Sequence, residues 1–173
     1  MTRLVVEADG GSRGNPGLAG YGALVRDART GEVLAEVSEP IGHATNNVAE
    51  YGGLVAGLRA AAKIAPGADA EVRMDSRLVV EQMSGRWKIK HPDLRALAEQ
   101  ATQAARALGR VTYTWVPRER NKHADRLANE AMDAAAGDPG RPARTRSPGG
   151  PGAGRPAPDG TAPRQSSGTP GLW

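Results

Sequence analysis

The order in which strand-like and helix-like segments follow one another constrains the fold of this chain more than any other feature. Runs of β-branched and apolar residues predict five strands, at residues 3–9, 20–28, 32–38, 70–74 and 111–116. Apolar residues at three- and four-residue spacing, with capping signals, predict four helices, at residues 45–65, 76–84, 92–109 and 121–137. This order, βββαβααβα, predicts an α/β fold in which helices flank a five-stranded mixed sheet.

The composition predicts one domain with a core of small side chains. Hydrophobic residues make up 39% of the 173 residues, but aromatic residues only 3%, and Phe is absent. We therefore expect a core of Ala, Val and Leu. Trp115 is expected in the core, whereas a core position and a base-stacking position are equally open for Trp87. The expected large anchors are Tyr21, Tyr51, Trp87, Tyr113 and Trp115.

The absence of Cys excludes disulfides, thiolate metal sites and cysteine nucleophiles, and it fits a reducing compartment. The N-terminal segment meets the acid Glu7 too early for a signal peptide, and no apolar run approaches the length of a membrane span. We therefore expect a cytoplasmic protein without a membrane partner, and a monomer.

The composition changes after Gly137, which predicts a domain at residues 1–137 and a disordered Pro/Gly/Arg-rich linker or tail at residues 138–173. The tail holds five Arg and two Asp, and therefore supplies +3 of the net charge of +4. The remaining +1 leaves the predicted domain nearly neutral. Overall charge therefore does not by itself identify a nucleic-acid-binding protein.

Four acids occur at the ends of predicted elements. Asp9 ends the first strand and precedes a glycine-rich phrase expected to be a loop, Glu50 lies early in the first helix, Asp75 ends the fourth strand, and Asp125 begins the last helix. If residues 3–9 and 70–74 are neighbouring strands, their carboxyl ends bring Asp9 and Asp75 together. Each acid alone has an ordinary explanation as a helix cap, a favourable charge near a helix N-terminus or a solvated residue. Their joint occurrence favours a catalytic cluster.

Hard oxygen ligands without Cys and without a well-placed His favour Mg²⁺ or Mn²⁺ over Zn²⁺. Two such ions can activate a water molecule and stabilise the leaving oxygen of a phosphodiester. Crowded carboxylates also repel one another, so we expect some of them to have raised pKa values in the absence of metal.

Four phrases of the sequence resemble those of the type 1 ribonuclease H family, and the resemblance covers residues 1–137. The phrases run from Asp9 to Gly17, from Thr45 to Tyr51, from Asp75 to Val79 and from Asn121 to Ala128. The resemblance implies a ribonuclease H-like fold and an endonuclease that cuts the RNA strand of RNA–DNA hybrids, leaving 5′-phosphate and 3′-hydroxyl ends. It also implies that two Mg²⁺ or Mn²⁺ ions are held by Asp9, Glu50, Asp75 and Asp125.

The resemblance further implies residues that contact the hybrid. Residues expected to face the RNA strand and its 2′-hydroxyl groups, the groups that distinguish RNA from DNA, are Gly11, Ser12, Asn15, Asn46 and Arg77. Residues expected near the DNA strand and its phosphates are Thr45, Asn47, Trp87, Lys88 and Lys90.

The sequence departs from the family at two places. Many relatives carry a His in the loop before the last acid; here Arg118 stands at that place, where it can hold a phosphate but cannot act as a base. His123 lies on the same predicted helix as Asp125 but is turned away from it, so it is not assigned that role. Some relatives also insert a Lys-rich segment after the third acid, which is replaced here by the short segment 85–91.

Some members of the family are joined by a Pro/Gly-rich linker to a histidine phosphatase domain. The tail resembles such a linker, so we expect a covalently fused phosphatase domain in a longer parent protein. Two other functions remain open: a non-catalytic module that binds hybrids or double-stranded RNA, and another nuclease of the same superfold. The four acids count against the first, and Asn15 with the segment 45–47 counts against the second.

Overall fold

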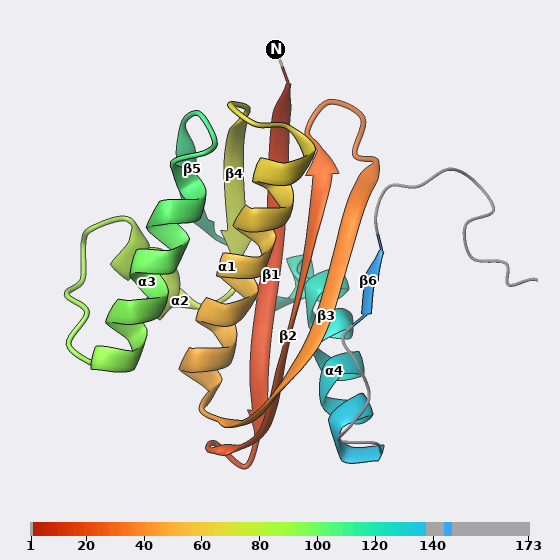
Figure 1. The fold of residues 1–173 in the computed structure, drawn as a ribbon, viewed down its shortest axis with the longest axis vertical. Helices are drawn as coiled ribbons and strands as arrows, with labels where there is room; N and C mark the ends of the chain where they lie inside the picture. The colour runs from red at the N-terminus through yellow and green to blue at the C-terminus, as the bar shows by residue number, and fades with distance from the viewer. Residues whose placement is uncertain (1, 138–143, 147–173) are drawn as a thin grey trace, which may run out of the picture.

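The computed structural model describes residues 2–137 and 144–146, and it confirms the predicted α/β architecture (Figure 1). Its strands are β1 (Arg3–Arg13), β2 (Gly17–Asp27), β3 (Val33–Ala44), β4 (Asp69–Met74), β5 (Val111–Trp115) and β6 (Arg144–Arg146). Its helices are α1 (Asn46–Ile64), α2 (Arg77–Met83), α3 (Pro92–Ala105), the 3₁₀ turn η1 (Arg118–Arg120) and α4 (Lys122–Gly137).

The sheet is mixed, with the strand order β5-β4-β1-β2-β3-β6. Strands β1, β2 and β3 pair antiparallel, whereas β4 pairs parallel with both β1 and β5. The five predicted strands are therefore all present. The short strand β6 pairs antiparallel with β3 and lies in the segment for which we expected a disordered tail. Residues 138–143 and 147–173, the rest of that expected tail, lie outside the described residues.

The glycine-rich segment after Asp9 continues as a strand to Arg13, so the prediction of a loop is wrong for residues 10–13, and the turn comprises only residues 14–16. The antiparallel ladder between β1 and β2 continues to the pair formed by Arg13 and Leu18. The segment has little side-chain bulk because helices pack directly on the backbone at this end of the sheet. A Cβ atom added to Gly22 of β2, for example, would lie 2.4 Å from Leu127 Cβ of α4.

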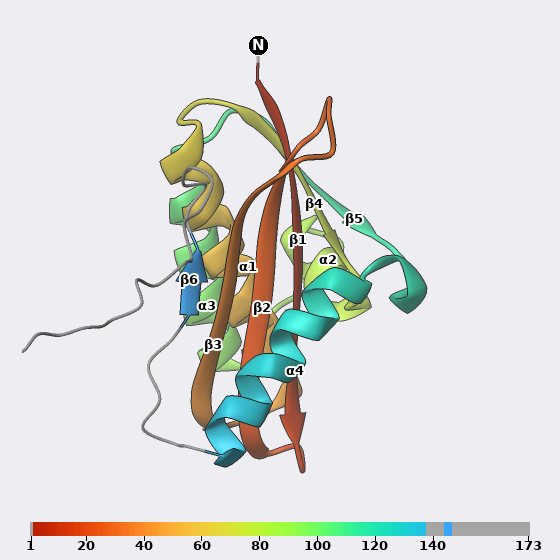
Figure 2. The same cartoon turned by 90° about the vertical axis from the view of Figure 1, so that its right-hand side faces the viewer.

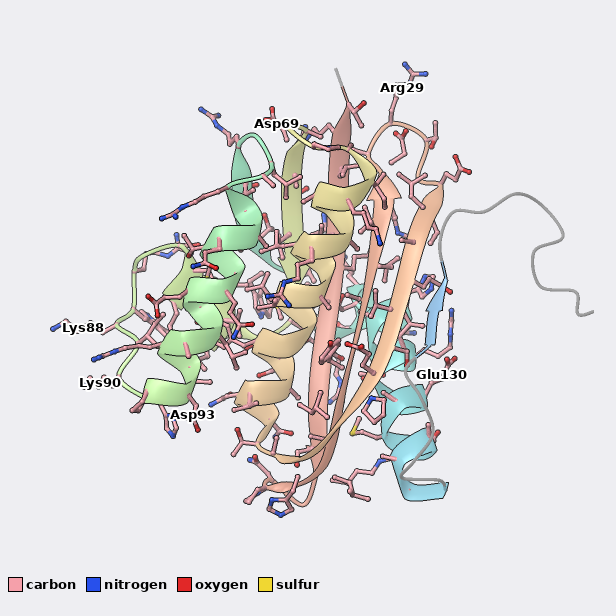
Figure 3. The ribbon with its side chains drawn as sticks, viewed as in Figure 1. Arg29, Asp69, Lys88, Lys90, Asp93 and Glu130 are labelled. Atoms are coloured by element: carbon pink, nitrogen blue, oxygen red, sulfur yellow. The ribbon has the colours of Figure 1, made fainter. Side chains whose placement is uncertain are left out.

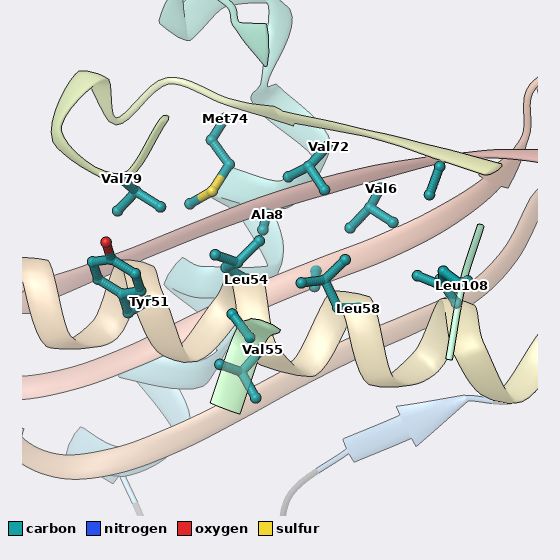
Figure 4. Packing of buried hydrophobic residues seen from close by; sticks show 14 of the residues in the cluster. Val6, Ala8, Tyr51, Leu54, Val55, Leu58, Val72, Met74, Val79 and Leu108 are labelled. Atoms are coloured by element: carbon teal, nitrogen blue, oxygen red, sulfur yellow. The ribbon is translucent and has the colours of Figure 1, made fainter. Parts of the chain in front are cut away.

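The sheet separates two helical layers, as Figure 2 shows: α1 and α3 lie on one face, and α4 crosses the other. The larger core fills the space between the sheet and α1, where Val6, Leu54, Leu58 and Val72 are fully buried (Figure 4). Apolar burial of this kind is the main source of stability for such a fold. On the face toward α4, Gly20 and Gly22 of β2 leave the room that lets that helix approach closely.

The aromatic anchors divide into two groups. Tyr51 is fully buried, whereas 47% of Trp87 and 40% of Trp115 remain exposed. The expectation that Trp115 belongs to the core is therefore wrong. Trp115 is the last residue of a strand at the edge of the sheet, so its ring extends past the region that the helices cover. No helix within residues 2–137 is long and apolar enough to cross a membrane.

Candidate active site

Strand pairing brings Asp9 and Asp75 together. The parallel ladder between β1 and β4 pairs Glu7 with Arg73, and the same register continued by two residues places Asp9 beside Asp75. Asp75 directly follows β4, and Asp9 lies within β1 at the level where β4 ends, so both stand at the carboxyl edge of the parallel part of the sheet. This is the edge at which the ligands of open α/β sheets bind. The expected adjacency of the two strands is thus confirmed by the topology.

Glu50 reaches the same place because α1 touches the end of β1. A Cβ atom added to Gly10 would lie 2.3 Å from the carbonyl carbon of Ala49, a distance that no side chain tolerates. Only glycine lets strand and helix approach so closely. Thr45 fixes the start of the helix, since its side chain accepts a hydrogen bond from the amide of Val48 at 3.2 Å.

Carboxylate oxygens of Asp9, Glu50 and Asp75 all lie within 4.8 Å of one another, a spacing at which they could hold a metal ion. Asp125, in the first turn of α4, is not part of this triad but lines the same cavity. Asn121 ties the start of that helix to β1, because its buried side chain donates a hydrogen bond of 3.0 Å to the carbonyl oxygen of Ala8. The four acids are thus brought together from four separate elements.

The four acids line a cavity of about 630 Å³. Its walls come from the end of β1, the start of α1, the end of β5, the segment before α4 and the exposed side of α4. The lining residues are Asp9, Gly10, Gly11, Ser12, Arg13, Asn46, Asn47, Glu50, Asp75, Trp115, Arg118, Asp125, Ala128, Asn129 and Met132. Polar groups therefore dominate a concave surface with the acids inside it.

Three acids of the cavity have raised pKa values, as their crowding led us to expect. Burial, and then the charge of Asp75, raise the pKa of Asp9 from 3.8 to about 8. Burial and then the charge of Asp75 raise the pKa of Glu50 to about 7, although a hydrogen bond with Ser76 opposes the shift. The pKa of Asp75 is also raised, mainly by burial, against the opposing charge of Arg118. Burial thus contributes more than the mutual repulsion on which the expectation was based.

Five of the residues expected to contact substrate line this cavity together with the acids: Gly11, Ser12, Asn46, Asn47 and Arg118. Side-chain hydrogen bonds fix their backbone. Asn46 Oδ1 accepts from the amide of Ser12 at 2.7 Å, and Asn15 Oδ1 accepts from the amide of Asn46 at 3.0 Å. Asn15 has a positive φ of 32°, a conformation that Asn adopts more readily than most residues. Asn15 and Thr45 thus shape the rim of the cavity without lining it.

The other expected substrate residues lie apart from the acids. Trp87, Lys88 and Lys90 are exposed on the segment between α2 and α3 and do not line the cavity. Figure 3 shows Lys88 and Lys90 pointing away from the helices. Arg77 lies over the ring of Trp115, with its guanidinium carbon 4.6 Å from the ring centroid. Arg77 therefore does not line the cavity itself but contacts Trp115, which does.

His123 faces away from the acids, as its place on the helix led us to expect. Its Nε2 lies 2.5 Å from Glu36 Oε2 of β3, and its Nδ1 lies 3.3 Å from Arg26 Nη2 of β2. Arg26 in turn donates a hydrogen bond of 2.8 Å to the buried carboxylate of Glu7. His123 therefore belongs to a polar network that joins α4 to the sheet.

Six residues of the cavity wall were not predicted as site residues, and three of them, Arg13, Trp115 and Asn129, carry hydrogen-bonding side chains. Trp115 donates a hydrogen bond from Nε1 to the carbonyl oxygen of Asp75 at 3.2 Å, which holds the backbone beside that acid. Arg13 forms an ion pair of 2.8 Å with Asp133, and Asn129 follows Asp125 by one helical turn. The i, i+4 spacing of Asp125 and Asn129 was a signal that could have revealed Asn129.

Comparisons with known proteins give the family. A sequence profile described as "Reverse transcriptase-like" matches residues 7–131. The "Bifunctional protein Rv2228c" of Mycobacterium tuberculosis (strain ATCC 25618 / H37Rv) is 59% identical over 156 residues, which cover 87% of this chain and 43% of that protein. The chain thus spans less than half the length of this relative.

Two solved structures extend the comparison. The N-terminal RNase H domain of Rv2228c from Mycobacterium tuberculosis, solved as a fusion with maltose binding protein, superposes with a TM-score of 0.77 at 61% identity, over 80% of this chain and 99% of that one. LC11-RNase H1, from a compost metagenome and solved in complex with an RNA/DNA hybrid, superposes with a TM-score of 0.73 at 39% identity, over 77% of this chain and 99% of that one. The chain therefore belongs to the ribonuclease H family.

Proposed function

We propose that this chain is a metal-dependent endonuclease that hydrolyses the RNA strand of RNA–DNA hybrids, leaving 5′-phosphate and 3′-hydroxyl ends. The observation that carries the proposal is the triad Asp9, Glu50 and Asp75, whose carboxylate oxygens lie within 4.8 Å of one another on the floor of an open polar cavity. A solved relative at 39% identity is bound to an RNA/DNA hybrid, which supports the substrate class.

The chemistry of the donor set fits Mg²⁺ or Mn²⁺. Carboxylate oxygens are the ligands that these hard cations prefer. Burial also raises the pKa values of Asp9 and Glu50 in the metal-free protein, because it disfavours their ionised forms. Bound cations would stabilise these carboxylates. Asp9, Glu50, Asp75 and Asp125 would hold two ions. Bound there, the ions would lower the pKa of the attacking water and neutralise charge on the leaving oxygen.

The remaining residues of the cavity would bind and orient the hybrid. The amide of Gly11 and the side chains of Asn46 and Asn47 offer hydrogen-bonding groups at the cavity wall, where 2′-hydroxyl groups could be recognised. Arg118 lines the cavity, and its charge acts on Asp75, so we assign it to the phosphate that is cleaved or released. The fused histidine phosphatase domain and the monomeric state stay predictions.

The test is cleavage of a labelled RNA–DNA hybrid, with duplex DNA and duplex RNA as controls, in Mg²⁺, Mn²⁺ or EDTA. We expect the hybrid's RNA strand alone to be cut, and only with metal. Asp75→Asn is expected to abolish cutting while binding of the hybrid persists. If the unmodified chain binds the hybrid without cutting it, the chain is a binding module and the proposal fails. Equal cutting of duplex DNA would instead favour another nuclease of the same superfold.

A further inference from the structure

Two successive hydrogen bonds through the side chain of Gln82 connect the helix that carries Glu50 with the segment between α2 and α3. Tyr51, the residue after Glu50, donates a hydrogen bond from its hydroxyl to Gln82 Oε1 at 2.7 Å. Gln82 Nε2 then donates to the carbonyl oxygen of Lys88 at 3.1 Å. Both ends of one amide are used, so a single side chain joins α1, α2 and the segment 84–91, here called the α2–α3 loop.

This connection is shielded from water at its centre. Tyr51 is fully buried and Gln82 is 9% exposed. Figure 4 shows the tyrosine ring beside Val79, within the core between α1 and the sheet. A buried polar group that loses its partner keeps the full cost of its desolvation, so each of these two hydrogen bonds holds its partner firmly in place.

Ile89 is the residue of the α2–α3 loop that packs against the core. A groove of about 630 Å³ lies between the loop and α3, lined by residues of α2, the loop and α3, including Gln82, Ile89 and Arg95. Polar contacts hold the loop on two sides: Gln82 of α2 donates to the carbonyl oxygen of Lys88, and Arg95 Nε of α3 donates to the carbonyl oxygen of Ile89 at 3.0 Å. Directed hydrogen bonds thus add to the packing of Ile89 in fixing the position of the loop, and Gln82 makes the one that leads back to α1.

The loop presents groups suited to a nucleic acid at a distance from the cavity. Lys88 and Lys90 extend from it into solvent (Figure 3), and Trp87 is 47% exposed. Ammonium groups bind phosphates, and an exposed indole ring can lie against a sugar or a base. None of the three lines the cavity that holds the acids.

We propose that Gln82 is a positioning residue that sets the spacing between the acid cluster and a second contact surface for the hybrid, formed by Trp87, Lys88 and Lys90. The inference rests on the proposed function. Two contact points at a fixed spacing bind a rigid duplex better than two that move independently, because the cost of ordering the loop is removed in advance. Gln82 therefore strengthens the binding of long hybrids that reach both surfaces. It does not affect the binding of short hybrids that reach only the acids.

The experiment compares two hybrids. The long one is chosen so that Lys88→Ala raises its KM, and the short one so that Lys88→Ala leaves its KM unchanged. Gln82→Met removes both hydrogen bonds at similar volume, and Tyr51→Phe removes only the link to α1. Both variants are expected to raise KM for the long hybrid by about fivefold, which corresponds to about 1 kcal/mol. The kcat on both hybrids and the KM of the short hybrid should not change.

Controls separate positioning from general destabilisation. Gln103→Met alters an exposed glutamine of α3 that lines the same groove, and it should leave both hybrids unaffected. Adding Lys88→Ala to Gln82→Met should have less than the product of the two single effects, since both act through the same contact. Tyr51→Phe keeps the buried ring, so the test survives if Gln82→Met is too unstable to assay.

Equal KM changes on long and short hybrids, or a fall in kcat alone, would overturn the positioning role. So would the failure of Lys88→Ala to affect any hybrid length, because the second contact surface would then not exist. Dissociation constants of both hybrids in EDTA repeat the comparison without cleavage. A chain that cuts no hybrid, yet shows the length-dependent loss of binding, would refute the proposed function and retain the role of Gln82.

Discussion

Replacing Asp9 with Asn should stabilise the metal-free protein while abolishing its proposed activity. Asp9 as a residue is 7% exposed, and burial with the neighbouring charge of Asp75 raises the pKa of its carboxyl from 3.8 to about 8. At pH 7 the unfolded chain has this carboxyl ionised, whereas the folded protein must keep it protonated or bear the cost of a buried charge. Asn keeps an oxygen for the hydrogen bond from Gly10, which measures 2.9 Å in the structure, and has no charge to bury.

The structure sets an upper limit on the gain. The gap between pH 7 and a pKa of 3.8, at about 1.4 kcal/mol per pH unit, gives a ceiling of about 4 kcal/mol. Water and neighbouring side chains relax around a buried acid, so we expect about 1–2 kcal/mol in practice. Because the folded-state pKa is raised, the destabilisation by Asp9 is absent below about pH 4 and grows as the pH rises toward about 8.

Urea denaturation in EDTA at a series of pH values between 4 and 8 tests this reasoning. The difference in free energy of unfolding between Asp9→Asn and the unmodified chain should be close to zero at pH 4 and should increase with pH. Asp93→Asn, at an exposed acid, should change stability by less than about 0.5 kcal/mol at every pH. A variant no more stable than the unmodified chain at pH 7, or a gain independent of pH, would refute the argument.

Three further predictions concern the same site. Gly10→Ala should lower the melting temperature and kcat together in thermal melts and cleavage assays, because its Cβ would push against the backbone of Ala49; unchanged values would mean that strand and helix need not touch. Arg118→Ala should reduce turnover more than it weakens Mg²⁺ binding, measured by steady-state kinetics and calorimetry, and the opposite order would remove Arg118 from phosphate handling. Mg²⁺ affinity should keep rising with pH to about 8, since Asp9 and Glu50 bind as carboxylates and have pKa values of about 8 and 7; an affinity that levels off below pH 6 would contradict these shifts.

The sequence by itself determined the secondary structure and the identity of the acids. Period-two and period-3.6 patterns are local, so they located the five strands and four helices to within a few residues of their observed ends. Two strands end later than predicted: β3 continues to Ala44 instead of residue 38, and β1 continues to Arg13 instead of Asp9. The glycines of β1 indicated a loop, but pairing with β2 extends the strand to Arg13, and that pairing depends on residues remote in the sequence.

Only the tertiary structure decided which groups share a site. The crossover that places β4 beside β1 brings Asp75 to Asp9, and no local pattern specifies that neighbour. Trp115 has the apolar character of a core residue, but its place at the end of an edge strand leaves it in the cavity wall. The cluster of raised pKa values and the buried link through Gln82 likewise arise from burial and directed hydrogen bonds between distant segments, which composition and periodicity do not encode.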